Sequence, residues 1–151
     1  MQPDQYKRIV KASAWYDLLA TAGFATPWTF AMIHQALTHL AAALQLRGSL
    51  PAFAPIHMLM ANLLGTIVVL WAVLRLRDPQ VMYGRFDAVG RWLFAAWQIY
   101  ALVHGASFIV LFFTIFELVF AILQSLPIGA SQSHQLDHPF SSDLTTRSRR
   151  T

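Results

Sequence analysis

Residues 56–76 read IHMLMANLLGTIVVLWAVLRL, and this stretch decides the fold. It contains no acidic side chain, and its one arginine, Arg75, lies next to its end. At a rise of about 1.5 Å per residue, a helix of this length matches the hydrocarbon core of a bilayer, which is about 30 Å thick. The stretch therefore predicts a transmembrane helix.

Three other apolar regions surround it in the sequence. Residues 87–105 and 108–126 each have the length of a span, and only a short turn separates them. The remaining region, residues 12–46, contains Pro27. Together these regions predict an all-α, polytopic membrane protein whose transmembrane domain, residues 1–126, is a bundle of four helices.

The region 12–46 is too long for one simple span, and Pro27 allows two interpretations. In one, residues 12–33 cross the membrane with a kink near Pro27, and residues 34–46 form an amphipathic segment on the outer face. In the other, a span begins at Pro27 and residues 5–24 lie on the membrane surface. We favour the first, because the second gives the interfacial helix too many large apolar side chains.

The composition predicts a small water-exposed surface. Hydrophobic residues make up 56% of the 151 residues and charged residues 12%, whereas soluble domains carry about 25% charged residues. The chain has no cysteine, which excludes disulfides, thiolate metal sites and cysteine nucleophiles.

Lysines and arginines gather at the ends of the apolar regions, a distribution that indicates membrane topology and argues against a nucleic-acid partner. Only Arg47 falls on the second side of the membrane. By the positive-inside rule both termini are cytoplasmic, an N-in and C-in arrangement. The first side carries Lys7, Arg8, Lys11, Arg75, Arg77, Arg85, Arg147, Arg149 and Arg150.

Residues 127–151 differ from the rest of the chain. They are polar, lack periodicity and contain few large apolar side chains, so they cannot bury enough surface to offset the entropy of ordering. We expect a disordered cytoplasmic tail.

Three ionisable side chains lie inside the apolar regions: Asp17, Arg91 and Glu117. A charge in hydrocarbon costs several kcal/mol unless it is paired or has a function. Counting residues from the turn between the last two regions puts Arg91 near the level of both carboxylates. Gln98 shares a helix face with Arg91, because the two are seven residues apart. We predict an intramembrane polar cluster of these four residues, which is either a structural joint between helices or a proton or ligand site.

Other residues near the ends of the predicted spans are expected to have structural roles. Asp87 is expected to cap the N-terminus of the helix over 87–105. Arg75 is expected to extend its side chain toward the membrane surface, where the guanidinium reaches water. Gly84 and Gly90 are expected to allow close approach of a neighbouring helix.

Four histidines fall at the outer end of the predicted bundle: His34, His39, His57 and His104. Imidazole is a common ligand of metals and of haem iron, and it also hydrogen-bonds a quinone headgroup. His34 and His39 are five residues apart, which puts them on different helix faces, and no metal-ligand motif is present. We predict no metal site, and treat this end as a possible ligand site for a quinone or haem cofactor.

The overall plan resembles small bacterial four-helix membrane proteins of the DoxX-like type. The resemblance covers about residues 12–126 and rests on helix number, chain size and the glutamate of Phe116-Glu117-Leu118. Residues 83–91, YGRFDAVGR, also look like a feature of uncharacterised bacterial membrane proteins. Some DoxX relatives are linked to quinone-coupled oxidation of sulfur compounds, so the resemblance implies a bacterial inner (cytoplasmic) membrane location and a redox role.

Three functions follow from these observations. The first is a non-enzymatic accessory or scaffold protein of the membrane, and the absence of phosphate-binding loops and nucleophile motifs agrees with it. The second is a quinone- or haem-associated redox subunit. The third is a small proton-coupled transporter with Glu117 as the proton-carrying group. The expected partners are the lipid bilayer and either other membrane subunits or a second copy of this chain.

Overall fold

The computed structural model describes residues 1–129, and within them the chain is all-α, as the sequence predicts. A single turn of 3-10 helix, η1 (Ala22–Phe24), follows the first helix. The predicted tail lies almost wholly outside the described residues. The five α-helices are α1 (Pro3–Thr21), α2 (Pro27–Ala43), α3 (Pro55–Arg77), α4 (Val81–Val103) and α5 (Ile109–Ser125).

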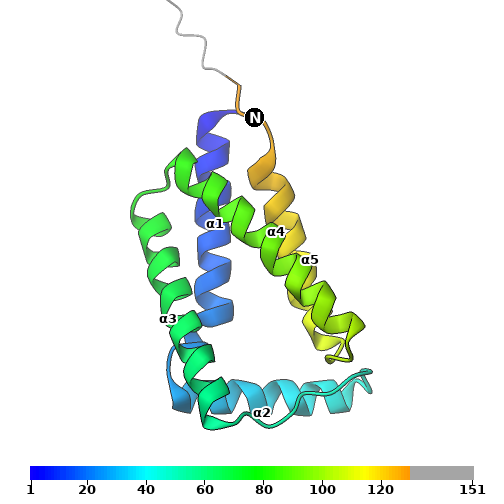
Figure 1. Cartoon of the computed structure of the whole chain (residues 1–151). Coiled ribbons are helices and arrows are strands. Elements are labelled where there is room, and N and C mark those ends of the chain that lie inside the picture. Colours follow the sequence, from blue (N-terminus) through cyan, green and yellow to red (C-terminus); the bar gives the residue numbers. More distant parts are fainter. Residues whose placement is uncertain (130–151) are drawn as a thin grey trace, which may run out of the picture.

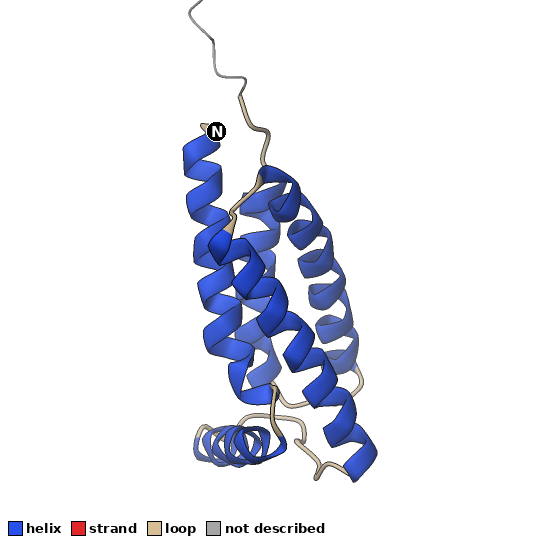
Figure 2. Cartoon of the chain, turned by 90° about the vertical axis from the view of Figure 1, so that its left-hand side faces the viewer, coloured by secondary structure: helices blue, strands red, loops and turns tan. Residues whose placement is uncertain are grey.

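Four of the helices form an elongated bundle, and the fifth lies across its end. Helix α1 packs mainly beside α3, and α4 packs mainly beside α5 (Figure 1). Helix α2 is seen from the side in Figure 1 and end-on in Figure 2, so its axis runs roughly perpendicular to the bundle. Met1 and Gly129 meet at the opposite end, where the Gly129 amide donates to the Met1 carbonyl at 2.9 Å.

The predicted kinked helix over residues 12–33 is wrong. Helix α1 ends at Thr21, and a separate helix begins at Pro27. Thr26 has an extended backbone and its side chain accepts from the Thr29 amide, so it caps the new helix, and Pro27 at the first helical position lacks an amide that would need a partner. Residues 27–33 therefore belong to the crossing helix together with most of the segment 34–46.

The later helices lie close to their predicted ranges, except that α4 begins earlier than predicted. Helix α3 and helix α5 differ from residues 56–76 and 108–126 by one residue at each end. Helix α4 begins at Val81, six residues before Asp87. Asp87 is thus in the interior of α4, and its predicted role as an N-cap is wrong.

Charged and small residues are inside the bundle, and large apolar residues are outside. Arg75 is 0% exposed and Arg91 2%, whereas Ile67 is 63% exposed and Leu70 64%. The buried apolar residues are mostly alanines, including Ala14, Ala72, Ala88, Ala95 and Ala121. This distribution is the reverse of that in a water-soluble domain, where large apolar residues fill the core and charged residues are mostly exposed.

Among residues 1–129, one helix is both long enough and apolar enough to cross a membrane by length and composition alone, and it is α3. Helix α5 is equally apolar in character but has only 17 residues. Helices α1 and α4 contain more charged residues than α3 and α5, which lowers their mean hydropathy.

A loop contact closes the end of the bundle near α2. The Ser107 amide donates to the Ser49 carbonyl at 3.2 Å, and the Ser49 amide donates to Gly105 at 3.2 Å. Gly48 has φ +89°, and a Cβ there would lie 2.2 Å from the Ala106 carbonyl oxygen. Only glycine fits this position, which ties the α2–α3 loop to the α4–α5 turn.

Candidate functional site

Arg91, on α4, lies at the centre of a buried ion network. Its Nη1 donates to Glu117 Oε2 at 2.8 Å, and its Nη2 donates to Asp17 Oδ1 at 2.7 Å. Its Nε donates to Asp87 Oδ2, one helical turn away, at 2.9 Å. Arg91 therefore bridges Asp17 and Glu117, as the sequence predicts, and also holds a third carboxylate.

Arg75, on α3, is the second cation of the network. Its Nη2 pairs with Asp17 Oδ2, and its Nη1 lies 2.6 Å from Asp87 Oδ2. The predicted extension of this side chain to the membrane surface is wrong, because Arg75 is fully buried. It turns inward since two carboxylates are within reach there, and an ion pair in the interior replaces the water it would meet outside.

Neutral side chains complete the hydrogen bonding around the charges. Trp71 Nε1 donates to Asp87 Oδ1 at 2.9 Å. Ser13 Oγ accepts from Arg75 Nη1 at 3.0 Å and from Gln124 Nε2 at 2.7 Å. The ring of Phe120 lies 5.0 Å from the Arg91 guanidinium carbon, within the range of a cation–π contact. Each of α1, α3, α4 and α5 thus contributes a polar side chain to the network.

The charges of the network do not balance. Three carboxylates, from Asp17, Asp87 and Glu117, meet two guanidinium groups. With all five groups ionised, the network carries one excess negative charge. Glu117 accepts the fewest hydrogen bonds of the three carboxylates. Its Oε2 is bonded to the Arg91 guanidinium, and within residues 1–129 its Oε1 accepts no hydrogen bond.

The sequence predicts three of the five charged residues of this network. Asp17, Arg91 and Glu117 come together, but Gln98 does not join them, because it lies two turns along α4 toward the other end of the bundle. Asp87 and Arg75 were missed as members. The signals were present: Asp87 and Arg91 have the i, i+4 spacing of a helical ion pair, and Arg75 lies on the same face of α3 as the small residues Gly65 and Ala72.

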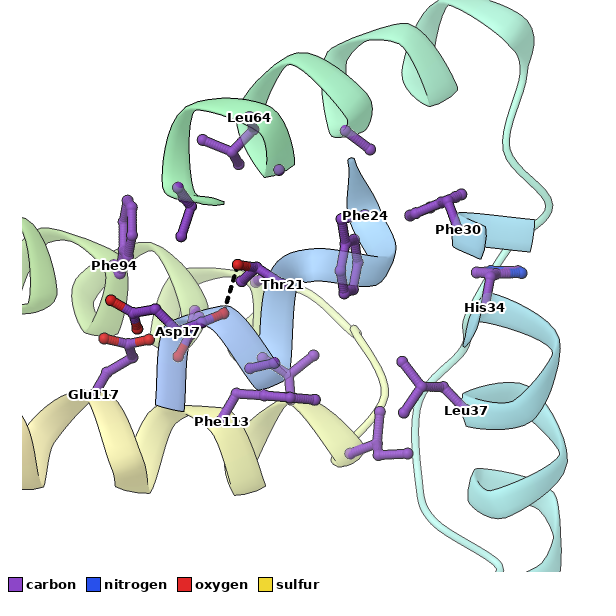
Figure 3. Close-up of a pocket in the computed structure, with 18 of the residues that line it drawn as sticks. Asp17, Thr21, Phe24, Phe30, His34, Leu37, Leu64, Phe94, Phe113 and Glu117 are labelled. Atoms are coloured by element: carbon purple, nitrogen blue, oxygen red, sulfur yellow. Dashed lines mark hydrogen bonds between the residues drawn. The ribbon is translucent and has the colours of Figure 1, made fainter. Parts of the chain in front are cut away.

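A cavity of about 620 Å³ lies beside the network, where α4 and α5 diverge from α1 and α3. Figure 3 shows Asp17 and Glu117 at one end of this cavity, and Phe30, His34 and Leu37 at the other. Most of its walls are apolar, formed by Phe24, Leu64, Val68, Phe94, Trp97 and Phe113. The volume is in the range of about 300–1,000 Å³ that is typical of small-molecule sites.

Few polar residues line the cavity: Asp17 and Glu117 carry acceptors, whereas Tyr16, His34 and Trp97 carry groups that can donate. The carboxylates of Asp17 and Glu117 line it, but neither guanidinium group does. Gln98 also lines it, and its buried Oε1 has no hydrogen-bond partner within the described part of the chain. The Thr21 hydroxyl is already engaged, because it donates to the Asp17 carbonyl at 2.6 Å.

The four histidines at the α2 end do not form one site. His34 Nε2 lies 3.1 Å from the Pro51 carbonyl, and its ring packs against Phe30 and Phe53. His57 contacts Phe53, while His104 stacks on Tyr100 at 4.0 Å. Of the four, only His34 lines the large cavity. Among residues 1–129, no three His, Asp or Glu side chains are placed to hold a metal ion.

Comparison with family models, with curated proteins and with solved structures finds no match for this chain. The resemblance to DoxX-like proteins therefore stays a prediction.

Proposed function

We propose that the chain is an integral membrane protein whose four bundle helices cross the bilayer, with both termini on the cytoplasmic side. The observation that carries this proposal is the reversed burial, with paired charges inside and large apolar side chains outside. In water such an exterior is an aggregation hazard, whereas in lipid it is the expected surface. Helix α3 alone has the length and composition of a span, and the apolar exteriors of its neighbours extend the same surface around the bundle.

The position of α2 supports the same arrangement. It runs across the end of the bundle opposite the residues Met1 and Gly129 (Figure 1). A helix in this orientation lies in the plane of the membrane interface when the bundle stands along the membrane normal. Trp28, at its first turn, is 77% exposed, as suits a side chain at the headgroup level.

Within this membrane protein, the ion network acts as the joint between the helices. Every carboxylate is held by at least one guanidinium, and the two guanidiniums come from different helices, α3 and α4. Such a network specifies one register, because any axial shift separates charges that cannot find water. The best supported function is therefore a non-enzymatic accessory or scaffold protein of the membrane.

The cavity raises a second candidate, a ligand-carrying role such as the quinone- or haem-associated redox subunit, but its polar lining gives this candidate little support. Quinone carbonyls require hydrogen-bond donors, whereas the carboxylates at the network end of the cavity, from Asp17 and Glu117, are acceptors. A haem would have only His34 as an imidazole ligand from the wall. A purified protein with a Soret band, or with co-purifying quinone, would support this candidate over the first.

The topology is tested with reporter fusions at Ala54 and Gln80, at the two ends of α3. We expect a periplasmic-type signal at Ala54 and a cytoplasmic-type signal at Gln80, with the protein remaining in the membrane pellet after washing at alkaline pH. Signals from the same side at both positions, or release of the protein by the wash, would contradict the proposal.

A further inference from the structure

The excess negative charge of the network is directed at the cavity. Asp17 and Glu117 line the cavity, while Arg75 and Arg91 lie behind them. The Oε1 atom of Glu117 accepts no hydrogen bond within residues 1–129. In a medium of low dielectric constant, an uncompensated charge attracts a counter-charge strongly, because little solvent screens it.

Gln98 is a second residue of the cavity wall that carries an unpartnered acceptor. The Oε1 atom of Gln98 is buried and has no hydrogen-bond partner in the described chain, although its residue lines the cavity. A buried acceptor without a partner destabilises the protein, and a ligand that donates to it recovers part of this loss. At the end of the cavity near the network, a ligand whose polar end donates hydrogen bonds is therefore favoured.

The walls suit a cation attached to an apolar body. Tyr16, Phe94, Trp97 and Phe113 supply aromatic rings around the cavity. Aromatic faces attract an organic cation, and they attract it most when water is excluded. The remaining walls are apolar and accommodate a hydrocarbon chain.

The cavity is also accessible from the outside of the bundle. Leu64 on α3 and Trp97 on α4 line it, and they are 55% and 65% exposed. Helices α3 and α4 are in contact near the loop that joins them, through Trp71 and Tyr83, and diverge farther along. A lipophilic molecule can therefore reach the cavity laterally from the bilayer.

From these observations we infer that the cavity binds a lipophilic amine, with its ammonium group at Glu117 and its apolar body along the aromatic walls. This inference rests on the proposed membrane location, because lateral access from lipid requires it. Glu117 is the binding carboxylate, and Asp17 contributes charge behind it.

The test measures binding of dodecylamine and of dodecanol to the full chain in lipid nanodiscs. The two probes share one hydrocarbon chain and differ in the charge of the head group. We expect the amine to bind at least tenfold more tightly than the alcohol. Glu117→Gln should remove this preference while the bundle stays folded, because its amide still accepts from Arg91.

Replacing either of two alanines of α4 by phenylalanine distinguishes binding in the cavity from nonspecific partition into the membrane. Ala101 lines the cavity, and Ala96 is exposed on the outside of the same helix. Ala101→Phe should fill the cavity and weaken amine binding at least tenfold, whereas Ala96→Phe should leave it unchanged.

Equal binding of amine and alcohol by the parent chain would overturn the inference, and so would unchanged amine binding by Ala101→Phe. If these results came from a chain that incorporates into nanodiscs and resists the alkaline wash, the membrane proposal would stand and only the ligand would be wrong. A chain that failed the wash would instead disprove the proposed function.

Discussion

Arg91 is the residue on which the bundle depends most. It is 2% exposed and holds carboxylates from α1, from α5 and from its own helix. Its planar guanidinium has five donors on three nitrogen atoms, so one side chain reaches three carboxylates in different directions, whereas the three donors of a lysine share one nitrogen.

Replacing Arg91 by alanine should cost about 3–5 kcal/mol of unfolding free energy, because three carboxylates then lose their shared cation in a dry interior. Denaturant titration in mixed micelles measures this change. Leu93→Ala is the matched control on the same helix, since Leu93 is 52% exposed and should contact lipid. A loss for Arg91→Ala no larger than for the control would show that the network does not stabilise the fold.

The three carboxylates should differ in importance. Asp17 accepts from both guanidiniums, whereas Glu117 accepts from Arg91 alone. Glu117→Gln removes the excess negative charge and keeps an acceptor, so it should cost less than about 1 kcal/mol. Asp17→Asn leaves one acceptor oxygen for two cations and should cost about 2–3 kcal/mol, in line with hydrogen bonds to charged groups. The reverse order in the same titration would contradict the assigned contacts.

The sequence predicts the ion pairs of residues deep inside the predicted spans, and it fails to predict those of residues near the ends of the spans. In the predicted spans, Arg91, Asp17 and Glu117 lie too deep to reach water, so their pairing can be expected from position alone. Arg75 and Asp87 lie near the ends of predicted spans, where solvent is an equally good partner. The i, i+4 spacing of Asp87 and Arg91 hinted at an ion pair, but the start of α4 at Val81 and the inward face of α3 were needed to place Arg75 and Asp87 in the network.

At the scale of elements, α1 can approach α4 closely because of the glycine at position 84, whereas the glycine at position 90 has no such role. A Cβ on Gly84 of α4 would lie 2.6 Å from Val10 Cγ2 and 2.7 Å from the Tyr6 hydroxyl oxygen, both on α1. A Cβ on Gly90 would meet no atom within 4 Å. The expectation that both glycines admit a neighbouring helix therefore holds for Gly84 alone.

Gly84→Ala should destabilise the protein by about 1–3 kcal/mol, because the added methyl forces α1 and α4 apart. Gly90→Ala should be neutral or should stabilise it by up to about 1 kcal/mol, through the higher helix propensity of alanine. Thermal unfolding of both variants in one detergent provides the comparison. Equal melting temperatures for the two variants would contradict the helix crossing at Gly84.

Arg85, near the start of α4, holds the C-terminal end of α5 in place. Its Nη1 donates to the Gln124 carbonyl and its Nη2 to the Leu126 carbonyl, each at 2.8 Å. These carbonyls have no partner inside the helix, and a cation at a helix C-terminus also meets the negative end of its dipole. An arginine predicted only to set topology therefore also caps a helix.

For the whole molecule, the sequence predicts the order of the helices well and the start of α2 poorly. Apolar length identifies α3 and α5 directly. The break at residues 22–26 was harder, since a proline inside an apolar region either kinks a helix or begins a new one. The cap from Thr26 and the packing of the Phe24 backbone against Gly65 decide for a new helix. The cavity is not predictable from the sequence, because it results from the divergence of two helix pairs.

In the proposed arrangement, the apolar exterior of the bundle faces lipid while its charges face one another. The sequence has no cysteine, so single cysteines at Ile67, Leu93 and Ile115 can each carry a spin label in liposomes. Collision rates with oxygen and with a water-soluble nickel chelate then report the surroundings of each label. We predict that oxygen reaches all three labels and the nickel chelate reaches none. Collisions with the nickel chelate at these mid-helix positions would show a water-facing exterior and contradict the account.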